Sequence, residues 1–188
     1  MSRWPPDTAA RLKGAALALF SEHGFANVTA AQVAERAGMT ERTFFRHFKT
    51  KDDVLFEDYH GFKAALTEAI ALAPMDIGTR GLMRLVAQFL SERFQPDREM
   101  HRTLLRVVIS DPTLKARALL RDDEWGDAVA EGFTRRGYAA MRGLVVAAVT
   151  TAIFRIIYRA WLSDQQDDTL AERYAAIEED FVMSLDEV

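Results

Sequence analysis

Apolar residues recur at the spacing of an α-helix along almost the whole chain, and no alternating run typical of a β-strand interrupts them. Five residues of the first segment illustrate the pattern: Leu12, Ala15, Ala16, Leu19 and Phe20. Their spacing of i, i+3, i+4, i+7 and i+8 places them on one face of a helix. The chain is therefore predicted to be all-α, with about nine helices.

Two short helices are predicted to follow the first one. Thr29 is a suitable N-cap, and Gln32 three residues later completes a capping-box pattern. Gly38 can adopt the tight or left-handed turn that separates this helix from the next, at about 40–47. Two short helices joined by a glycine turn form the arrangement in which the second helix enters the major groove of DNA. Residues 7–51 are therefore predicted to form a helix-turn-helix DNA-binding unit.

The charge of the chain is unevenly distributed. Residues 1–51 contain eight basic and four acidic side chains, a net charge of +4, which leaves −8 for residues 52–188. A basic amino-terminal quarter on an acidic body is typical of a protein in which only one part meets phosphate. The alternative is that these are ordinary surface charges of helices without functional meaning.

The composition also bears on the compartment. The chain has no cysteine, which excludes disulfides and thiolate metal sites and fits a reducing cytoplasm. The longest apolar stretch, Gly143–Phe154, has about 12 residues, whereas about 20 are needed to span a bilayer. Asp7, Arg11 and Lys13 interrupt the region where a signal peptide would need continuous apolar residues. We therefore expect a soluble cytoplasmic protein without a membrane partner.

The packing of a helix-turn-helix makes further demands on the third helix. Phe44 and Phe48 lie four residues apart and are expected to anchor one side of it, because such residues share a helix face. The opposite side is then left to polar and basic residues, which are the types that base edges and phosphates require.

Pairs of residues at spaced positions repeat the pattern of a known family: Gly24-Phe25, Val28-Thr29, Val33-Ala34, Ala37-Gly38, Met39-Thr40, Phe44-Phe45, His47-Phe48 and Thr50-Lys51. In these residues the chain resembles the DNA-binding region of TetR family regulators. The resemblance implies a transcriptional regulator, most commonly a repressor that a small-molecule effector releases from a palindromic operator in double-stranded DNA. It implies these DNA-facing positions: Ala30, Thr40, Arg42, Thr43, Phe45, Arg46, His47 and Lys51.

Phe45 stands where the family usually has a tyrosine whose hydroxyl commonly contacts a phosphate, and Glu41 is an acid where Lys, Pro or a small residue is usual. Lys51 is expected at a helix amino terminus, where the dipole disfavours a cation unless a phosphate is bound. Arg3 and Trp4 precede the first helix and could form an arm that reaches DNA or an unstructured tail.

The rest of the chain, residues 52–188, is expected to be a second helical domain after a DNA-binding domain at 1–51. A helix at about 51–71 would connect the two domains. Further helices are predicted at 76–94, 99–109, 112–136, 139–163 and 167–186.

The family resemblance implies that this domain binds a small ligand and that its last two helices form a homodimer. Candidate ligand-lining residues, most of which are expected to be ordinary core, are Phe62, Met83, Phe89, Leu105, Trp125, Phe133 and Met141. Candidate interface residues are Val145, Val149, Phe154, Ile157, Trp161, Tyr174, Ile177 and Phe181. A buried core helix at 139–163 is the alternative. His101, Arg102 and Arg106 could meet an acidic ligand, although a solvated face is the favoured interpretation.

Other classes of protein fit less well. The four histidines are scattered without metal-ligand spacing, and the sequence contains no phosphate-binding loop and no nucleophile elbow. We therefore expect no catalytic residue, cofactor or metal. A DNA-binding dimer that has no small-molecule effector is the alternative to the ligand-responsive regulator.

Overall fold

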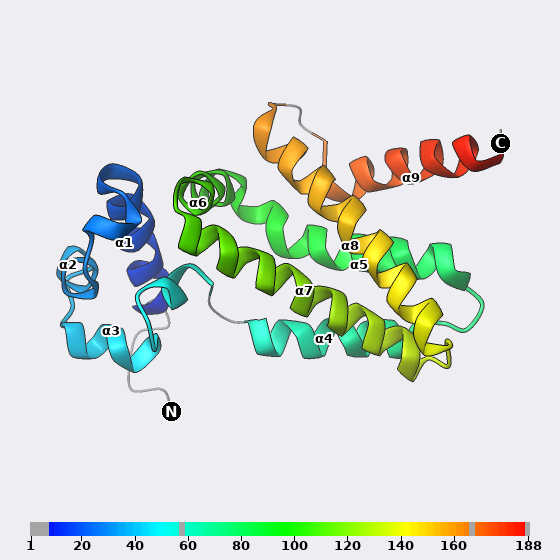
Figure 1. Cartoon of the computed structure of the whole chain (residues 1–188), viewed down its shortest axis with the longest axis horizontal. Coiled ribbons are helices and arrows are strands. Elements are labelled where there is room, and N and C mark those ends of the chain that lie inside the picture. Colours follow the sequence, from blue (N-terminus) through cyan, green and yellow to red (C-terminus); the bar gives the residue numbers. More distant parts are fainter. Residues whose placement is uncertain (1–7, 57–58, 166–167, 187–188) are drawn as a thin grey trace. The chain divides into compact units, whose positions relative to one another are not determined.

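The computed structural model describes residues 8–56, 59–165 and 168–186 and is shown in Figure 1. The amino-terminal elements are α1 (Thr8–His23), the 3-10 turn η1 (Phe25–Asn27), α2 (Ala30–Arg36), α3 (Glu41–His47) and the 3-10 turn η2 (Asp52–Leu55). The remaining elements are α4 (Tyr59–Leu72), α5 (Gly78–Phe94), the 3-10 turn η3 (Gln95–Asp97), α6 (Arg98–Ser110), α7 (Pro112–Arg135), α8 (Ala140–Ser163) and α9 (Leu170–Asp186). Within these ranges there is no strand, which confirms the predicted all-α class and the count of about nine helices.

The described residues form two compact units. The first contains the elements from α1 to η2 together with Arg102–Leu119, from α6 and α7. The second contains His60–His101 and the chain from Leu120 onward. The units therefore differ from the expected division at residue 51, because a segment more than 40 residues further along the chain packs with the amino-terminal helices.

The core of the first unit is formed by the faces that the apolar spacing predicted. Leu12, Ala16 and Phe20 of α1 are buried, and so are Val33 and Ala34 of α2. The capping box of α2 is confirmed, since the Thr29 hydroxyl accepts from the amide of Gln32 at 3.2 Å and the Gln32 side chain accepts from the amide of Thr29 at 2.8 Å. Gly38 has φ of 71°, which is the left-handed turn expected between the two short helices.

The helix predicted at 51–71 is interrupted, and this part of the prediction is wrong. The chain forms the short turn η2 and leaves helical geometry at Phe56, where φ is −118° and ψ is 20°, and α4 begins only at Tyr59. The carboxylate of Asp53 accepts the amide proton of Thr50 at 2.7 Å, so it closes a local turn. The other helices begin and end within three residues of their predicted limits.

In the second unit α4 and α7 run parallel, because the residues that contact each other rise together in number (Figure 1). Lys63 pairs with Glu124 at 3.3 Å, and the hydroxyl of Thr67 donates to the carbonyl of Ala128 at 2.9 Å. Further along, Gly132 lies against Ile70. The guanidinium of Arg136, just after α7, donates to the carbonyls of Ala73 and Pro74 at the end of α4. These contacts hold the two helices together along the whole of α4.

Helices α5, α8 and α9 pack against one another in the second unit. Glu178 of α9 is buried, and its two carboxylate oxygens accept from the guanidinium Nε of Arg80 at 3.0 Å and of Arg84 at 2.5 Å. A buried carboxylate is tolerated when it is paired and hydrogen-bonded in this way. These two ion pairs therefore fix the position of α9 on α5.

Helix α8 is the longest apolar helix among the described residues. It has 24 residues and a mean hydropathy of 1.7 over its most apolar window, so length and composition alone would permit it to cross a membrane. The apolar stretch Gly143–Phe154 seen in the sequence is shorter than this helix, because the helix continues past Arg155 to Ser163. One side of α8 lies in the core of the unit, where Phe154, Ile157 and Trp161 are buried, and 28% of its most apolar window is buried in all.

Gly132 is predicted to be required where α7 crosses α4. A Cβ atom at this position would lie 2.8 Å from Cβ of Ile70, so Gly132→Ala should lower the free energy of unfolding by about 1–3 kcal/mol. Gly126 lies in the same helix, and a Cβ atom added there would meet no atom within 4 Å, so Gly126→Ala should be neutral or stabilising by up to about 1 kcal/mol. Chemical denaturation of the two variants measures the difference, and equal effects would contradict the close contact.

Candidate nucleic-acid interface

Helix α3 is held in a defined orientation by its cap and by two buried rings. The Thr40 hydroxyl accepts from the amide of Thr43 at 3.2 Å, and the two threonine hydroxyls lie 3.0 Å apart. Phe44 and Phe48 are buried, and their ring centroids are 5.2 Å apart. Burial of two large rings on one side fixes which residues of α3 face outward.

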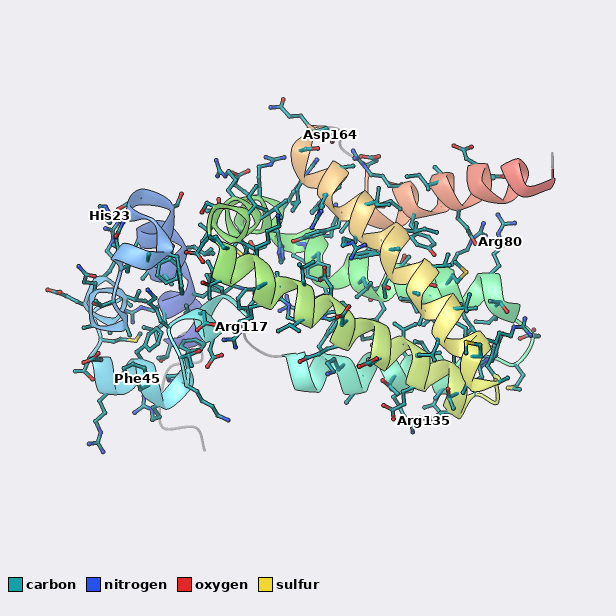
Figure 2. All side chains as sticks on the ribbon, in the orientation of Figure 1. His23, Phe45, Arg80, Arg117, Arg135 and Asp164 are labelled. Atoms are coloured by element: carbon teal, nitrogen blue, oxygen red, sulfur yellow. The ribbon has the colours of Figure 1, made fainter. Side chains whose placement is uncertain are left out.

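The outward side of α3 carries most of the residues that were expected to face DNA. Thr43 is half-buried, and the following residues are exposed: Thr40, Glu41, Arg42, Phe45, Arg46, His47 and Lys49. Lys49 was not among the candidates because the family pattern gave no reason to choose it. Figure 2 shows Phe45 on α3, where its ring is 50% exposed although Phe44 beside it is fully buried.

Ala30 does not belong to this exposed set. It is the first residue of α2, directly after the Thr29 cap, and only 7% of its side chain is exposed. The prediction that its side chain faces DNA is therefore not supported by the structure, because the methyl group packs in the core of the first unit. Arg3 and Trp4 lie outside the described residues.

Lys51 has partners within the protein. Its ammonium donates to the carbonyls of Phe25 at 2.6 Å and Val28 at 2.7 Å, and lies 3.9 Å from the centroid of the Phe25 ring. Burial lowers the pKa of Lys51, and the negative charges of Asp111 and Asp52 oppose this shift. The premise that only a phosphate would accommodate a cation here is wrong, since two backbone carbonyls and an aromatic face do so.

Other cations of the amino-terminal quarter are also used internally. The guanidinium of Arg11 donates to the carbonyl of Ala37 at 2.7 Å, next to the glycine turn. Arg36 pairs with Glu22 at 3.4 Å. The net charge is unchanged by these contacts, but fewer of the eight basic side chains are left for direct contact with a partner.

A residue far along the chain completes the first unit. The guanidinium of Arg117, from α7, donates to the carboxylates of both Asp52 and Asp53 in η2, and Figure 2 shows its position. Burial disfavours a charged Asp53, but hydrogen bonds from Thr50 and Arg117 outweigh burial and lower its pKa. One guanidinium thus holds both carboxylates and offsets one of their two negative charges close to the helix-turn-helix. No motif pointed to Arg117, because its partners lie more than 60 residues away.

In the second unit, three of the proposed ligand-lining residues contact one another. The ring centroid of Phe62 lies 5.0 Å from that of Phe89 and 4.9 Å from that of Trp125. Met83 is half-buried elsewhere on α5, and Phe133 is fully buried against Tyr138, with centroids 5.1 Å apart.

Two further proposed ligand-lining residues, Met141 and Leu105, also lie outside this cluster. Met141 is 72% exposed at the start of α8, so the prediction that it lines an interior pocket is wrong. Leu105 is half-buried and belongs to the first unit. Helical spacing alone does not distinguish these two residues from the buried ones.

The aromatic cluster extends to residues that the sequence did not indicate. Phe94 stacks on Trp125 with centroids 5.7 Å apart and also contacts His101 and Tyr158. His101 is buried, and its Nδ1 lies 3.0 Å from the Tyr158 hydroxyl, so it does not lie on the solvated face that was favoured for it. Burial also raises the pKa of Asp122 in this unit, against the opposing charges of Arg121, Arg155 and Arg159.

The proposed interface residues divide into two groups. Four are buried in the core of the chain itself, which contradicts their assignment to a surface: Phe154, Ile157, Trp161 and Tyr174. Three are exposed and remain candidates: Val145, Val149 and Ile177. Leu144 and Ile156 of α8 are also exposed. The side chain of Phe181 lies outside the described residues.

The sequence matches two family models. Residues 14–57 match the model of bacterial regulatory proteins of the tetR family, and residues 80–181 match the MftR C-terminal domain. The first match covers the helix-turn-helix, and the second covers more than half of the chain.

Individual proteins show the same relationship. The chain is 24% identical over 161 residues to the mycofactocin biosynthesis transcriptional regulator MftR of Mycobacterium tuberculosis, covering 84% of this chain and 81% of that protein. It is 29% identical over 163 residues to the HTH-type transcriptional regulator TcmR of Streptomyces glaucescens, covering 78% and 69%. The crystal structure of the TetR-family repressor FadR of Thermus thermophilus, in complex with lauroyl-CoA, has a similar fold, with a TM-score of 0.56, 19% identity and coverage of 89% and 90%.

The family is shown by the extent of these matches and by the helix-turn-helix geometry. The chain therefore belongs to the TetR family of bacterial transcriptional regulators.

Proposed function

We propose that this protein is a cytoplasmic, homodimeric repressor that binds a palindromic operator and is released from it by a small-molecule effector. The observation that carries the proposal is the outward side of α3, which presents polar and basic side chains while Phe44 and Phe48 anchor the opposite side. A helix supported in this way can enter a major groove without disturbing its own core. The matched family consists of regulatory proteins, so we propose no catalytic activity.

The geometry alters the set of proposed DNA contacts. Six of the original positions are kept: Thr40, Arg42, Thr43, Phe45, Arg46 and His47. Lys49 is added because it is exposed directly after α3. Ala30 and Lys51 are removed, since one is buried and the other donates to protein carbonyls. Arg42 lies in the first turn of α3 and is the best candidate for a base contact, because a guanidinium matches guanine N7 and O6.

We propose that two copies associate through the exposed apolar side of α8. Leu144, Val145, Val149 and Ile156 line this side, and Ile177 contributes from α9. Such a row of exposed apolar side chains is costly in water and is typical of an interface. A two-fold dimer would present two copies of α3 to a palindromic site.

The aromatic cluster of the second unit is the proposed effector site. Phe62, Phe89 and Trp125 supply apolar surface, and buried His101 with half-buried Tyr158 supplies a polar pair among the rings. Binding sites of small molecules commonly combine apolar walls with a few such polar groups. The lauroyl-CoA complex of Thermus thermophilus FadR supports the view that a fold of this kind can hold a small molecule.

The proposed release follows from linkage. An effector can shift the protein between a DNA-binding and a released state only if it binds the two states with different affinity. DNA must then weaken effector binding by the same factor by which the effector weakens DNA binding.

Selection from a random pool of duplexes tests the proposal directly. The purified full chain should enrich an inverted repeat, because a two-fold dimer reads two half-sites. Arg42→Ala should relax the preference at one or two positions in each half-site. Recovery of sequences without any common pattern would overturn sequence-specific binding.

The second candidate is a DNA-binding dimer that responds to no effector. The observation in its favour is the close contact between the rings of the aromatic cluster, whose centroids lie 4.9–5.0 Å apart around Phe62. A thermal-shift screen of metabolites separates the two functions. A compound that stabilises the protein and also releases the selected duplex would exclude the second candidate. If no stabilising compound releases DNA, the second candidate is favoured.

Lys51 and Lys49 are predicted to have different roles although they lie close together in the chain. Lys51→Met leaves two carbonyls without their donor and should lower the free energy of unfolding by about 1–3 kcal/mol, with an unchanged salt dependence of DNA binding. Lys49→Met should change stability by less than about 0.5 kcal/mol. It should reduce the slope of log K against log salt by about 0.9 for each phosphate that the lysine neutralises.

Denaturation and salt titrations of both variants check this pair of expectations. A Lys51→Met protein with normal stability and a reduced salt slope would restore Lys51 as a phosphate contact.

The exposed side of α8 is predicted to be required for dimerisation. Val145 is 55% exposed, and Val145→Glu would place a charge in the proposed interface, which should yield monomers at micromolar concentration and weaken operator binding at least about tenfold. Leu72→Glu, at an exposed position of α4, is the matched control and should remain dimeric. Light scattering after gel filtration measures the mass, and a dimeric Val145→Glu protein would show that the interface lies elsewhere.

A further inference from the structure

Phe45 is an unusual residue on the surface where it lies. Half of its side chain is exposed, and among the large apolar side chains that are described and exposed it is the one aromatic ring. Its edge-to-face contact with Phe44, at 5.4 Å between centroids, holds one side of the ring and leaves the rest open. The core of the helix-turn-helix is already filled by Phe44 and Phe48, so packing does not explain the exposed part of the ring.

The surroundings of Phe45 restrict what could cover this ring. The exposed residues of α3 around it are Glu41 and Arg42, one turn earlier, and Arg46 and His47, which follow it before the helix ends. Charged and polar groups on both sides disfavour a large apolar partner, because their desolvation would not be repaid. A small apolar group on a polar, negatively charged surface fits these surroundings better.

The major groove of DNA offers one such group. Thymine exposes its C5-methyl group there, and it is the one apolar group that the groove displays among hydrogen-bond donors and acceptors. The ring of Phe45 has no hydroxyl, so it can make no hydrogen bond to a phosphate.

We propose that Phe45 determines sequence specificity by packing on the methyl group of a thymine in each half-site. The proposal rests on the function proposed above and adds the base pair that this residue selects. Phe45 lies three residues after Arg42, a rise of about 4.5 Å along the helix, and base pairs are spaced about 3.4 Å apart. The thymine should therefore lie within about two base pairs of the position that Arg42 reads.

Replacement of thymine by deoxyuridine tests the contact, because it removes the methyl group and keeps every hydrogen bond of the base pair. The duplex selected by the wild-type protein is synthesised with deoxyuridine at one thymine position at a time. Fluorescence anisotropy then gives the affinity of the wild-type protein and of the variants Phe45→Ala, Phe45→Leu and Thr43→Ser. Circular dichroism melts verify that each variant is folded.

One thymine in each half-site is expected to respond. Its replacement should weaken wild-type binding about fourfold, the effect expected for one buried methyl group. Phe45→Ala should bind the thymine and deoxyuridine duplexes equally, so that the double-mutant cycle assigns the methyl group to this ring. Phe45→Leu should retain part of the effect. Thr43→Ser loses a methyl group but keeps its hydroxyl, and this variant should show the full loss of affinity when deoxyuridine replaces thymine.

Three results would overturn the proposal. If no deoxyuridine weakens wild-type binding while the duplex is still bound selectively, Phe45 reads no methyl group, although the proposed function stands. If the effect persists in Phe45→Ala and disappears in Thr43→Ser, the methyl group is read by Thr43. If the protein selects no duplex at all, the proposed function and this inference both fail.

Discussion

Burial of Phe44 and Phe48 is the interaction on which the functional surface depends. Helix α3 has only seven residues, so its own hydrogen bonds would not keep it folded or fix its rotation. The packing of α3 on α2 and the burial of the two rings do both, and each buried ring contributes about 1.5–3 kcal/mol. The identity of the residues that face outward, and therefore the chemistry offered to DNA, follows from this packing.

Charge in the first unit serves folding as well as binding. Arg11 and Lys51 donate to backbone carbonyls, Arg36 pairs with Glu22, and Arg117 binds two acids of η2. What remains for a partner is the smaller set of cations on and after α3. The electrostatic asymmetry of the chain is real, yet its local meaning depends on which cations already have an acceptor inside the protein.

Helix α8 shows why apolar composition does not identify a surface. Its residues are apolar nearly all round, and the sequence therefore assigned Phe154, Ile157 and Trp161 to a dimer interface together with Val145 and Val149. The first three fill the core of the chain, and the last two remain exposed. The difference depends on where α5 and α9 pack, and no local pattern contains that information.

Local sequence was enough to predict the all-α class, the limits of most helices, the capping box of α2, the left-handed glycine turn and the two anchoring rings, because all of these depend on residues within about four positions of one another. The roles of Lys51 and Arg117, the burial of Ala30 and His101, and the division of α8 into core and surface became visible only in the folded chain. Each of these depends on a partner that lies more than 20 residues away in the chain or on the packing of several helices. Hydrogen bonds and burial act through space, so their partners become visible only when the chain is folded.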